Sequence, residues 1–243
     1  HWSVDWRYLP TDTHFRLPPW AFRHVADEAE LPSLPDIETT VSAPRGFCNF
    51  VYSNPWCGVR NAFFLMLNER ERVDSLGSVY RNASHPLLGP RDGGDWVDTK
   101  LRVLNDYRFT IAFENEEHPG YTSEKILHAW AADSVPIYWG APVVAQDFPP
   151  DSSLSLYEAG SASRLVEQVL EAHHNPDRYR ALAAANPFRT GLVELLASGL
   201  RADADAFLDR VVDDARAHAG RPRLGARHRA VRSIRWARRT ALG

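Results

Sequence analysis

The chain has 243 residues, of which 44% are hydrophobic and eight are tryptophan, which is enough apolar material for one large domain or two small ones. Its formal net charge of −3 at pH 7 argues against a nucleic-acid-binding protein. No apolar run reaches the roughly 18 residues that a membrane-spanning helix needs, and no signal peptide is visible.

Residues 1–44 are rich in proline and tryptophan, and they carry no complete domain pattern. We therefore expect loops and short turns in this segment. The first residue is His and the chain contains a single Met, from which we expect that a natural start has been lost.

The stretch from Arg45 to Tyr107 alternates between strand-like and helix-like patterns. The predicted elements are a strand at 47–52, an amphipathic helix at 61–71, a short strand with its turn at 73–79 and a helix at 98–107. Arg60 lies at the start of the first helix. Cys48 and Cys57 have no His pair at ligand spacing, so they indicate neither a zinc site nor a disulfide framework, and we expect both to be buried.

The clearest pattern lies in residues 107–147. Apolar runs at 109–113 and 135–139 predict buried strands, and between them a helix is predicted to begin after Thr122 or Ser123. Strand, helix and strand form a βαβ unit, which implies a parallel sheet with a right-handed crossover. The polar loop at 114–120 follows the first strand, and open α/β sheets bind ligands at the carboxyl ends of their strands.

The residues of this loop and helix suit a nucleotide that carries a diphosphate and a sugar. A helix N-terminus favours an anion, and Lys125 adds a full positive charge in the first turn. Glu124 would repel a phosphate, so we expect it to face sugar hydroxyls, with Asn115 and Tyr121 supplying further hydrogen bonds. The alternative is a surface helix in which Glu124 complements the helix dipole and Lys125 is solvated; these residues alone leave both interpretations open.

The remaining elements follow the second strand of this unit. We predict a brief helix at 143–147, a strand at 152–157 and helices at 162–173 and 188–214. His173 and His174 are adjacent, so on a helix they point to different faces. We expect both at the surface and not in a metal site.

Residues 215–243 carry nine arginines and no acidic residue, interspersed with apolar side chains that include Trp236. A basic amphipathic segment of this kind suits an anionic membrane surface, which is its expected partner. A disordered tail and an RNA contact are the alternatives for this segment, although we expect no nucleic-acid partner for the chain as a whole.

Two blocks of the sequence resemble the α-1,3/1,4-fucosyltransferases of glycosyltransferase family ten. The segments that carry the resemblance are Phe50–Asn54, Val59–Phe63 and Val73–Gly77 in the first block, and Phe113–Asn115, Tyr121–Ile126, Val135–Pro142 and Asp147–Pro149 in the second. The blocks occur in the family's order, and the resemblance runs from about Gly46 to Pro187.

The resemblance implies an α/β fold of the GT-B type, in which a Rossmann-like parallel sheet forms the donor domain. It divides the chain into a remnant of the N-terminal acceptor domain with its linker at 1–44, a GDP-fucose-binding donor domain at 45–187, a C-terminal helix at 188–214 and the basic amphipathic tail at 215–243. It also implies chemistry without a cofactor or metal. We therefore expect Asp203-Ala204-Asp205, which looks like the DxD motif of metal-dependent sugar transferases, to be an ordinary helix surface.

The implied reaction transfers L-fucose from GDP-fucose to an N-acetylglucosamine-containing glycan, with an α-1,3 or α-1,4 linkage and inversion. By carry-over from the family, Arg60 and Lys125 hold the diphosphate and stabilise it as the leaving group. Glu124 binds ribose or fucose hydroxyls, and Asn115 and Tyr121 complete the pocket. A bacterial member is expected in the cytoplasm at the inner membrane face, and a eukaryotic one at the Golgi membrane.

The family's general base is a Glu in a Gly-Glu-Asn type turn, which precedes the part of the family that this chain resembles. Asp5 and Asp12 are candidates for a base by position only. A nucleotide-sugar-binding fragment with little or no catalysis is therefore the alternative function. A Rossmann dehydrogenase is disfavoured because no G-x-G-x-x-G opens a helix.

Overall fold

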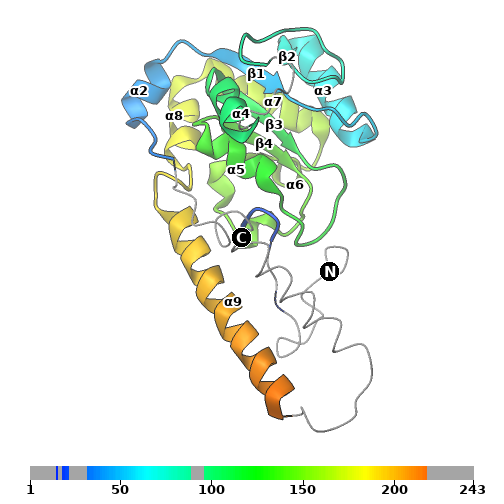
Figure 1. Cartoon of the computed structure of the whole chain (residues 1–243). Coiled ribbons are helices and arrows are strands. Elements are labelled where there is room, and N and C mark those ends of the chain that lie inside the picture. Colours follow the sequence, from blue (N-terminus) through cyan, green and yellow to red (C-terminus); the bar gives the residue numbers. More distant parts are fainter. Residues whose placement is uncertain (1–14, 16–17, 22–31, 89–95, 218–243) are drawn as a thin grey trace.

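The computed structural model describes residues 15, 18–21, 32–88 and 96–217, and it is built around one sheet (Figure 1). Its strands are β1 (Gly46–Phe50), β2 (Val73–Ser75), β3 (Tyr107–Phe113), β4 (Val135–Trp139) and β5 (Leu154–Ser155). They lie in the order β2-β1-β3-β4-β5, and every neighbouring pair is parallel. The chain moves outward from β1 to β2 and then returns to β3 on the other side of β1, so the strand order reverses between β1 and β3.

Helices cover both faces of this sheet. They are α2 (Ile37–Ser42), α3 (Gly58–Arg70), α4 (Trp96–Asn105), α5 (Glu124–Ala131), α6 (Leu156–Ala159), α7 (Ala162–His174), α8 (Pro176–Ala184) and α9 (Leu192–Ala217), with 3-10 turns η2 (Val144–Gln146) and η3 (Pro150–Ser152). Phe109, Ile111 and Phe113 of β3 pack with α3 and α7, whereas Ala112 packs with α5 on the opposite face. This alternation is the period of two expected for a strand that is buried on both faces.

Most of the predicted elements are confirmed, with ends that shift by a few residues. The helices predicted at 61–71 and 98–107 are α3 and α4, and the two strands of the βαβ unit are β3 and β4. The brief helix predicted at 143–147 is the 3-10 turn η2.

One strand prediction is confirmed with its turn and another is too long, and in both places a serine side chain bonds to nearby backbone where the strand ends. The short strand predicted with its turn at 73–79 is β2, which ends at Ser75; the Ser75 hydroxyl donates to the Val79 carbonyl at 2.6 Å and closes the turn. Of the strand predicted at 152–157, only Leu154–Ser155 pairs with β4. The Ser155 hydroxyl then accepts a hydrogen bond from the Tyr157 N–H and starts α6.

The cysteine prediction is confirmed and one histidine prediction is wrong. Cys48 and Cys57 are both buried free thiols. His174 is exposed as expected, but the ring of His173 is half-buried and packs against Phe47, with ring centroids 4.5 Å apart. The face of α7 that carries His173 lies against the sheet, and this burial lowers the pKa of the imidazole.

Two described segments before Arg45, residues 18–21 and α2, pack onto the sheet domain. The expectation of loops and short turns is wrong at α2, where the Asp36 carboxylate accepts a hydrogen bond from the Thr39 N–H at 3.0 Å and caps a short helix. Trp20 is buried, and its backbone N–H donates to the Thr122 carbonyl at 3.0 Å. The segment 18–21 therefore contacts the residues that precede α5.

A buried carboxylate joins four separate parts of the chain. Asp133, in the turn between α5 and β4, accepts hydrogen bonds from Thr40 of α2 at 2.5 Å, from Arg45 before β1 at 3.0 Å and from Arg189 before α9 at 2.5 Å. Two guanidinium groups thus compensate a carboxylate that is 3% exposed. This cluster holds α2, the residue before β1 and the segment before α9 to the turn that precedes β4.

The last helix, α9, extends away from the sheet (Figure 1). Only Val193 and Ala197 of this helix are buried, and both lie in its first two turns. Asp203 and Asp205 are exposed on its surface. Within the described ranges, no helix combines the length and the apolar character needed to cross a membrane.

Candidate functional site

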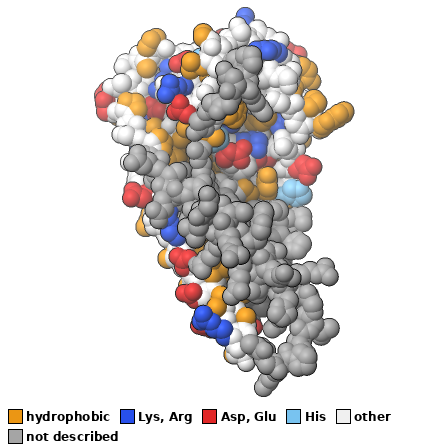
Figure 2. All heavy atoms as spheres, in the orientation of Figure 1, with side chains coloured by type: hydrophobic (Ala, Val, Ile, Leu, Met, Phe, Trp, Pro, Cys, Tyr) orange, Lys and Arg blue, Asp and Glu red, His pale blue; other side chains and the backbone are white. Residues whose placement is uncertain are grey.

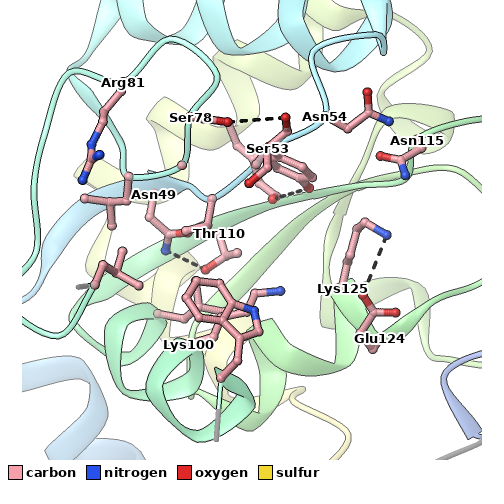
Figure 3. A pocket seen from close by; sticks show the side chains of 18 residues that line it. Asn49, Ser53, Asn54, Ser78, Arg81, Lys100, Thr110, Asn115, Glu124 and Lys125 are labelled. Carbon is pink, nitrogen blue, oxygen red and sulfur yellow. Dashed lines mark hydrogen bonds and ion pairs between the residues drawn. The ribbon is translucent and has the colours of Figure 1, made fainter. Parts of the chain in front are cut away.

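A cleft of about 640 Å³ opens at the carboxyl ends of β1 and β3, where the strand order reverses. It is lined by residues of β1 and β3 and of the loops that follow them, of the loop after β2, of α4 and of the start of α5. They include Asn49, Tyr52, Asn54, Arg81, Trp96, Lys100, Thr110, Asn115, Glu124 and Lys125. Figure 3 shows Asn54 and Asn115 at one end of the cleft and Arg81 at the other. Open α/β sheets bind ligands at this position, so the cleft is the candidate site.

The start of α5 is held by a buried carboxylate, that of Glu114, which follows β3. This side chain is fully buried, and it accepts hydrogen bonds from the Ser123 N–H and hydroxyl, both at 2.7 Å. The ammonium group of Lys125 lies 2.9 Å from the same carboxylate. Gly140 makes room for it, because a Cβ atom at Gly140 would lie 2.2 Å from the Glu114 Cγ.

Lys125 and Glu124 present different groups to the cleft. Burial acts to lower the pKa of Lys125, but the neighbouring carboxylates of Glu114 and Glu124 outweigh burial and raise it above its ordinary value. Lys125 therefore stays charged, with Glu114 as its counterion. The side chain of Glu124 is 54% exposed and lies 3.9 Å from the Lys125 ammonium, so its oxygens are available to accept hydrogen bonds from hydroxyl groups.

Arg60 is buried directly behind the cleft. Its guanidinium donates to the Asn115 side-chain oxygen at 2.7 Å and to the Asn54 carbonyl at 2.5 Å, and it lies over the Tyr52 ring at 4.0 Å from the ring centroid. All three of these neighbours line the cleft. Its Nε has no acceptor, and no carboxylate of the described residues lies within 4.0 Å of the guanidinium.

A fully buried charge with neutral partners is costly in free energy, so this arrangement needs a reason beyond packing. An anion in the cleft near Asn115 would supply the missing negative charge. The predicted contact between Arg60 and a ligand thus requires Asn54 or Asn115 to give way, because Arg60 itself is not among the described residues that line the cleft.

Three of the five residues that the sequence singled out come together in the cleft. Asn115, Glu124 and Lys125 line it, whereas Tyr121, like Arg60, is not among the described lining residues. The Tyr121 backbone N–H donates to the His118 carbonyl at 3.1 Å. The pKa of the Tyr121 hydroxyl is raised, chiefly by burial and also by the nearby Glu114 carboxylate. Asp5 and Asp12 lie outside the described residues.

Sequence reasoning missed several residues of the site. Glu114 belongs to the Phe113–Asn115 segment but was given no role, because nothing in a sequence indicates that a loop carboxylate will be buried. Lys100 and Arg81 lie outside the motifs, and only the packing of α4 and of the loop after β2 brings them to the cleft. The one signal for Lys100 was its place on a predicted helix.

The described residues contain no group of three or more His, Cys, Asp or Glu side chains that could hold a metal ion. Asp203 and Asp205 lie on the exposed surface of α9 and not in the cleft. The expectation of metal-independent chemistry stays a prediction.

Comparisons with known proteins agree with the resemblance in the sequence. Residues 47–183 match the model of "Glycosyltransferase family 10 (fucosyltransferase) C-term". The "Alpha-(1,3)-fucosyltransferase FucT" of Helicobacter pylori is 37% identical over 146 residues, which is 60% of this chain and 28% of that protein. The chain thus spans less than a third of this relative's length.

Two crystal structures of α1,3-fucosyltransferases share the fold. One contains GDP and superposes with a TM-score of 0.62 at 26% identity, covering 82% of this chain and 66% of that one. The other contains GDP-fucose and superposes with a TM-score of 0.54 at 27% identity, covering 75% of this chain and 52% of that one. The predicted α/β fold with a Rossmann-like parallel sheet is confirmed by the sheet itself, and its GT-B type by these similar structures.

Proposed function

This chain belongs to glycosyltransferase family 10, and from that membership we propose that it is the donor-binding part of a fucosyltransferase that takes L-fucose from GDP-fucose. The similar proteins are named as fucosyltransferases, and the similar structures contain GDP or GDP-fucose. The observation that supports the proposal most strongly is the cleft at the strand-order reversal, where Asn115, Glu124 and Lys125 meet in front of the buried Arg60.

The chemistry of the cleft fits a nucleoside diphosphate sugar. The donor's diphosphate leaves as GDP, so cations near it stabilise the charge that develops as the bond to the sugar breaks. Lys125 holds its proton and lies at the α5 N-terminus, where backbone N–H groups also favour an anion. Arg60 carries a planar fork that suits phosphate oxygens once Asn54 or Asn115 gives way, and Glu124 accepts hydrogen bonds from ribose or fucose hydroxyls.

The proposed acceptor is a hydroxyl of an N-acetylglucosamine-containing glycan, with an α-1,3 or α-1,4 linkage and inversion at the anomeric carbon. Inversion needs a base on the acceptor side of the sugar. The described residues offer no carboxylate for this role in the cleft except Glu124, which we assign to hydroxyl binding. A positioned base typically contributes roughly 10²–10⁴-fold to a rate, so we expect the base of the proposed reaction to come from outside the described lining of the cleft.

Calorimetry on the chain itself tests donor binding. We expect GDP and GDP-fucose to bind and NAD not to bind. Glu124→Gln should weaken the binding of GDP-fucose, whereas Glu116→Gln, which lies outside the cleft, should leave it unchanged. Binding of NAD in place of GDP would overturn the proposal. Transfer of labelled fucose from GDP-fucose to an N-acetylglucosamine-containing glycan, measured with and without EDTA, tests the reaction and its proposed independence of metal.

We further propose that residues 215–243, most of which lie outside the described residues, attach the protein to an anionic membrane surface. The support is their charge: nine arginines and no acidic residue. Sedimentation with vesicles of anionic lipid should capture the full chain at low salt and lose it at high salt. Equal sedimentation after deletion of residues 215–243 would contradict the proposal.

A further inference from the structure

The chain contains 28 lysines and arginines, of which only Lys100 and Lys125 are lysines, and both line the cleft. The other members of this set are all arginines. The two lysines differ in their surroundings. Lys125 has the buried Glu114 carboxylate 2.9 Å from its ammonium group, whereas no carboxylate of the described residues lies within 4.0 Å of Lys100.

Lys100 extends into the cleft from α4, and its closest polar partner is neutral. Its Nζ lies 3.2 Å from Nδ1 of His128 on α5. An ammonium group donates and does not accept, so His128 takes this hydrogen bond as a neutral imidazole with its proton on Nε2. Figure 3 shows Lys100 on the opposite side of the cleft from Arg81, a second cation without a carboxylate partner among the described residues.

The environment of Lys100 disfavours its charge while the cleft is empty. The pKa of Lys100 is lowered to about 8, chiefly by burial and also by the nearby Lys125, although the carboxylates of Glu124 and Glu114 act in the opposite direction. The groups that face it are His128, Glu124 and Lys125 on α5, Glu114 after β3 and Arg81 across the cleft. On α4 itself, Asp98 and Arg102 pair with each other at 3.0 Å. An anion beside Lys100 would favour its charged form and raise its pKa.

We propose that Lys100 binds the diphosphate of the donor, exchanging His128 for a phosphate oxygen, and that donor binding above neutral pH is therefore coupled to uptake of the Lys100 proton. The proposal rests on the function proposed above and adds a binding residue from α4 to it. Below about pH 8 the ammonium is already charged and binding needs no proton. Above that value the free cleft has lost the proton, and the bound anion restores it.

Three forms of the chain separate this role from a structural one: wild type, Lys100→Arg and Lys100→Met. Arginine keeps the charge but never releases its proton in this pH range, and methionine keeps the length without the charge. GDP binding is measured by calorimetry at pH 7.0 and 8.5, each in two buffers of different ionisation enthalpy, which gives the number of protons taken up. At pH 8.5 the phosphates of GDP are fully ionised, so they contribute no protons to the count.

Wild type should take up a large fraction of a proton at pH 8.5 and little at pH 7.0. Lys100→Arg should bind GDP within a few-fold of wild type at pH 7.0 and take up no proton at either pH. Lys100→Met should bind about tenfold or more weakly at pH 7.0, as expected for loss of a charged hydrogen bond.

Equal proton uptake by wild type and Lys100→Arg would overturn the inference, as would wild-type affinity in Lys100→Met. Should Lys100→Met not fold, the proton count in wild type against Lys100→Arg decides alone. Failure of the wild-type chain to bind GDP at all would instead refute the proposed function, so the two failures are distinguishable.

Discussion

Arg60 donates a hydrogen bond of 2.7 Å to the side-chain oxygen of Asn115, and this contact joins α3 to the loop after β3. The two elements lie on either side of the point where the strand order reverses, so the bond closes the back of the cleft. The guanidinium has the Tyr52 ring and the Asn54 carbonyl as its other neighbours and lacks a counterion among the described residues. A buried positive charge thus lies behind the cleft, and an anionic ligand can compensate it.

Replacing Arg60 with methionine should leave the chain as stable as wild type or more stable, while weakening GDP binding by about 10- to 100-fold. The reason is that the variant removes a buried charge without a counterion and keeps apolar volume over the Tyr52 ring. Urea unfolding and calorimetry measure the two quantities. Arg108→Met is the matched control. Arg108 lies over the Tyr179 ring outside the cleft, so its replacement should not change the affinity for GDP. A large loss of stability in Arg60→Met would mean that Arg60 serves the fold.

Replacing Glu114 with glutamine should destabilise the protein by about 1–3 kcal/mol, because Lys125 loses its counterion and one of the Ser123 donors faces an amide N–H. Unfolding in urea measures the change. Glu116→Gln is the control: its side chain is 78% exposed and contacts only His118, so we expect a change within about 0.5 kcal/mol. Equal stability of the two variants would show that Glu114 does not hold the start of α5.

Alanine at Gly140 should destabilise the protein by several kcal/mol or prevent folding. The added Cβ would lie 2.2 Å from the Glu114 Cγ, and the backbone φ of +154° is one that other residues rarely adopt. Gly199→Ala, on α9 with nothing within 4 Å of the new Cβ, should instead stabilise the helix by up to about 1 kcal/mol. Thermal unfolding of both variants measures this. A small change in stability for Gly140→Ala would show that Glu114 can move aside without destabilising the protein.

The stability of the unliganded chain should rise between about pH 8 and pH 10.5, and Lys100→Met should remove this rise. Burial lowers the pKa of Lys100 to about 8 in the folded state, so between that value and its ordinary value the unfolded chain binds more protons. Below pH 8 the full cost of the buried charge is present, and Lys100→Met should be more stable there by at most about 3 kcal/mol. Urea unfolding across this range measures the slope. Arg102→Met, exposed on the same helix, should leave the slope unchanged.

The sequence by itself determined the local elements and one edge of the site. Alternating and continuous apolar runs predicted β3 and β4, and Ser123 marked the start of α5. Because parallel strands joined by a helix place their carboxyl ends at the same edge, Asn115, Glu124 and Lys125 followed as cleft residues. These inferences needed only residues close together in the chain.

Tertiary structure alone decided the rest, because it depends on which buried surfaces fit together over long separations. Nothing local requires β1 to lie beside β3, yet this order brings Asn54 and Tyr52 to Asn115 and buries Arg60 behind them. Nothing local makes Glu114 a buried counterion, since Gly140 supplies the space from the next strand. Lys100 becomes part of the site only because α4 packs on α5. The packing of the whole core determines that contact, whereas helix periodicity depends only on residues close together in the chain.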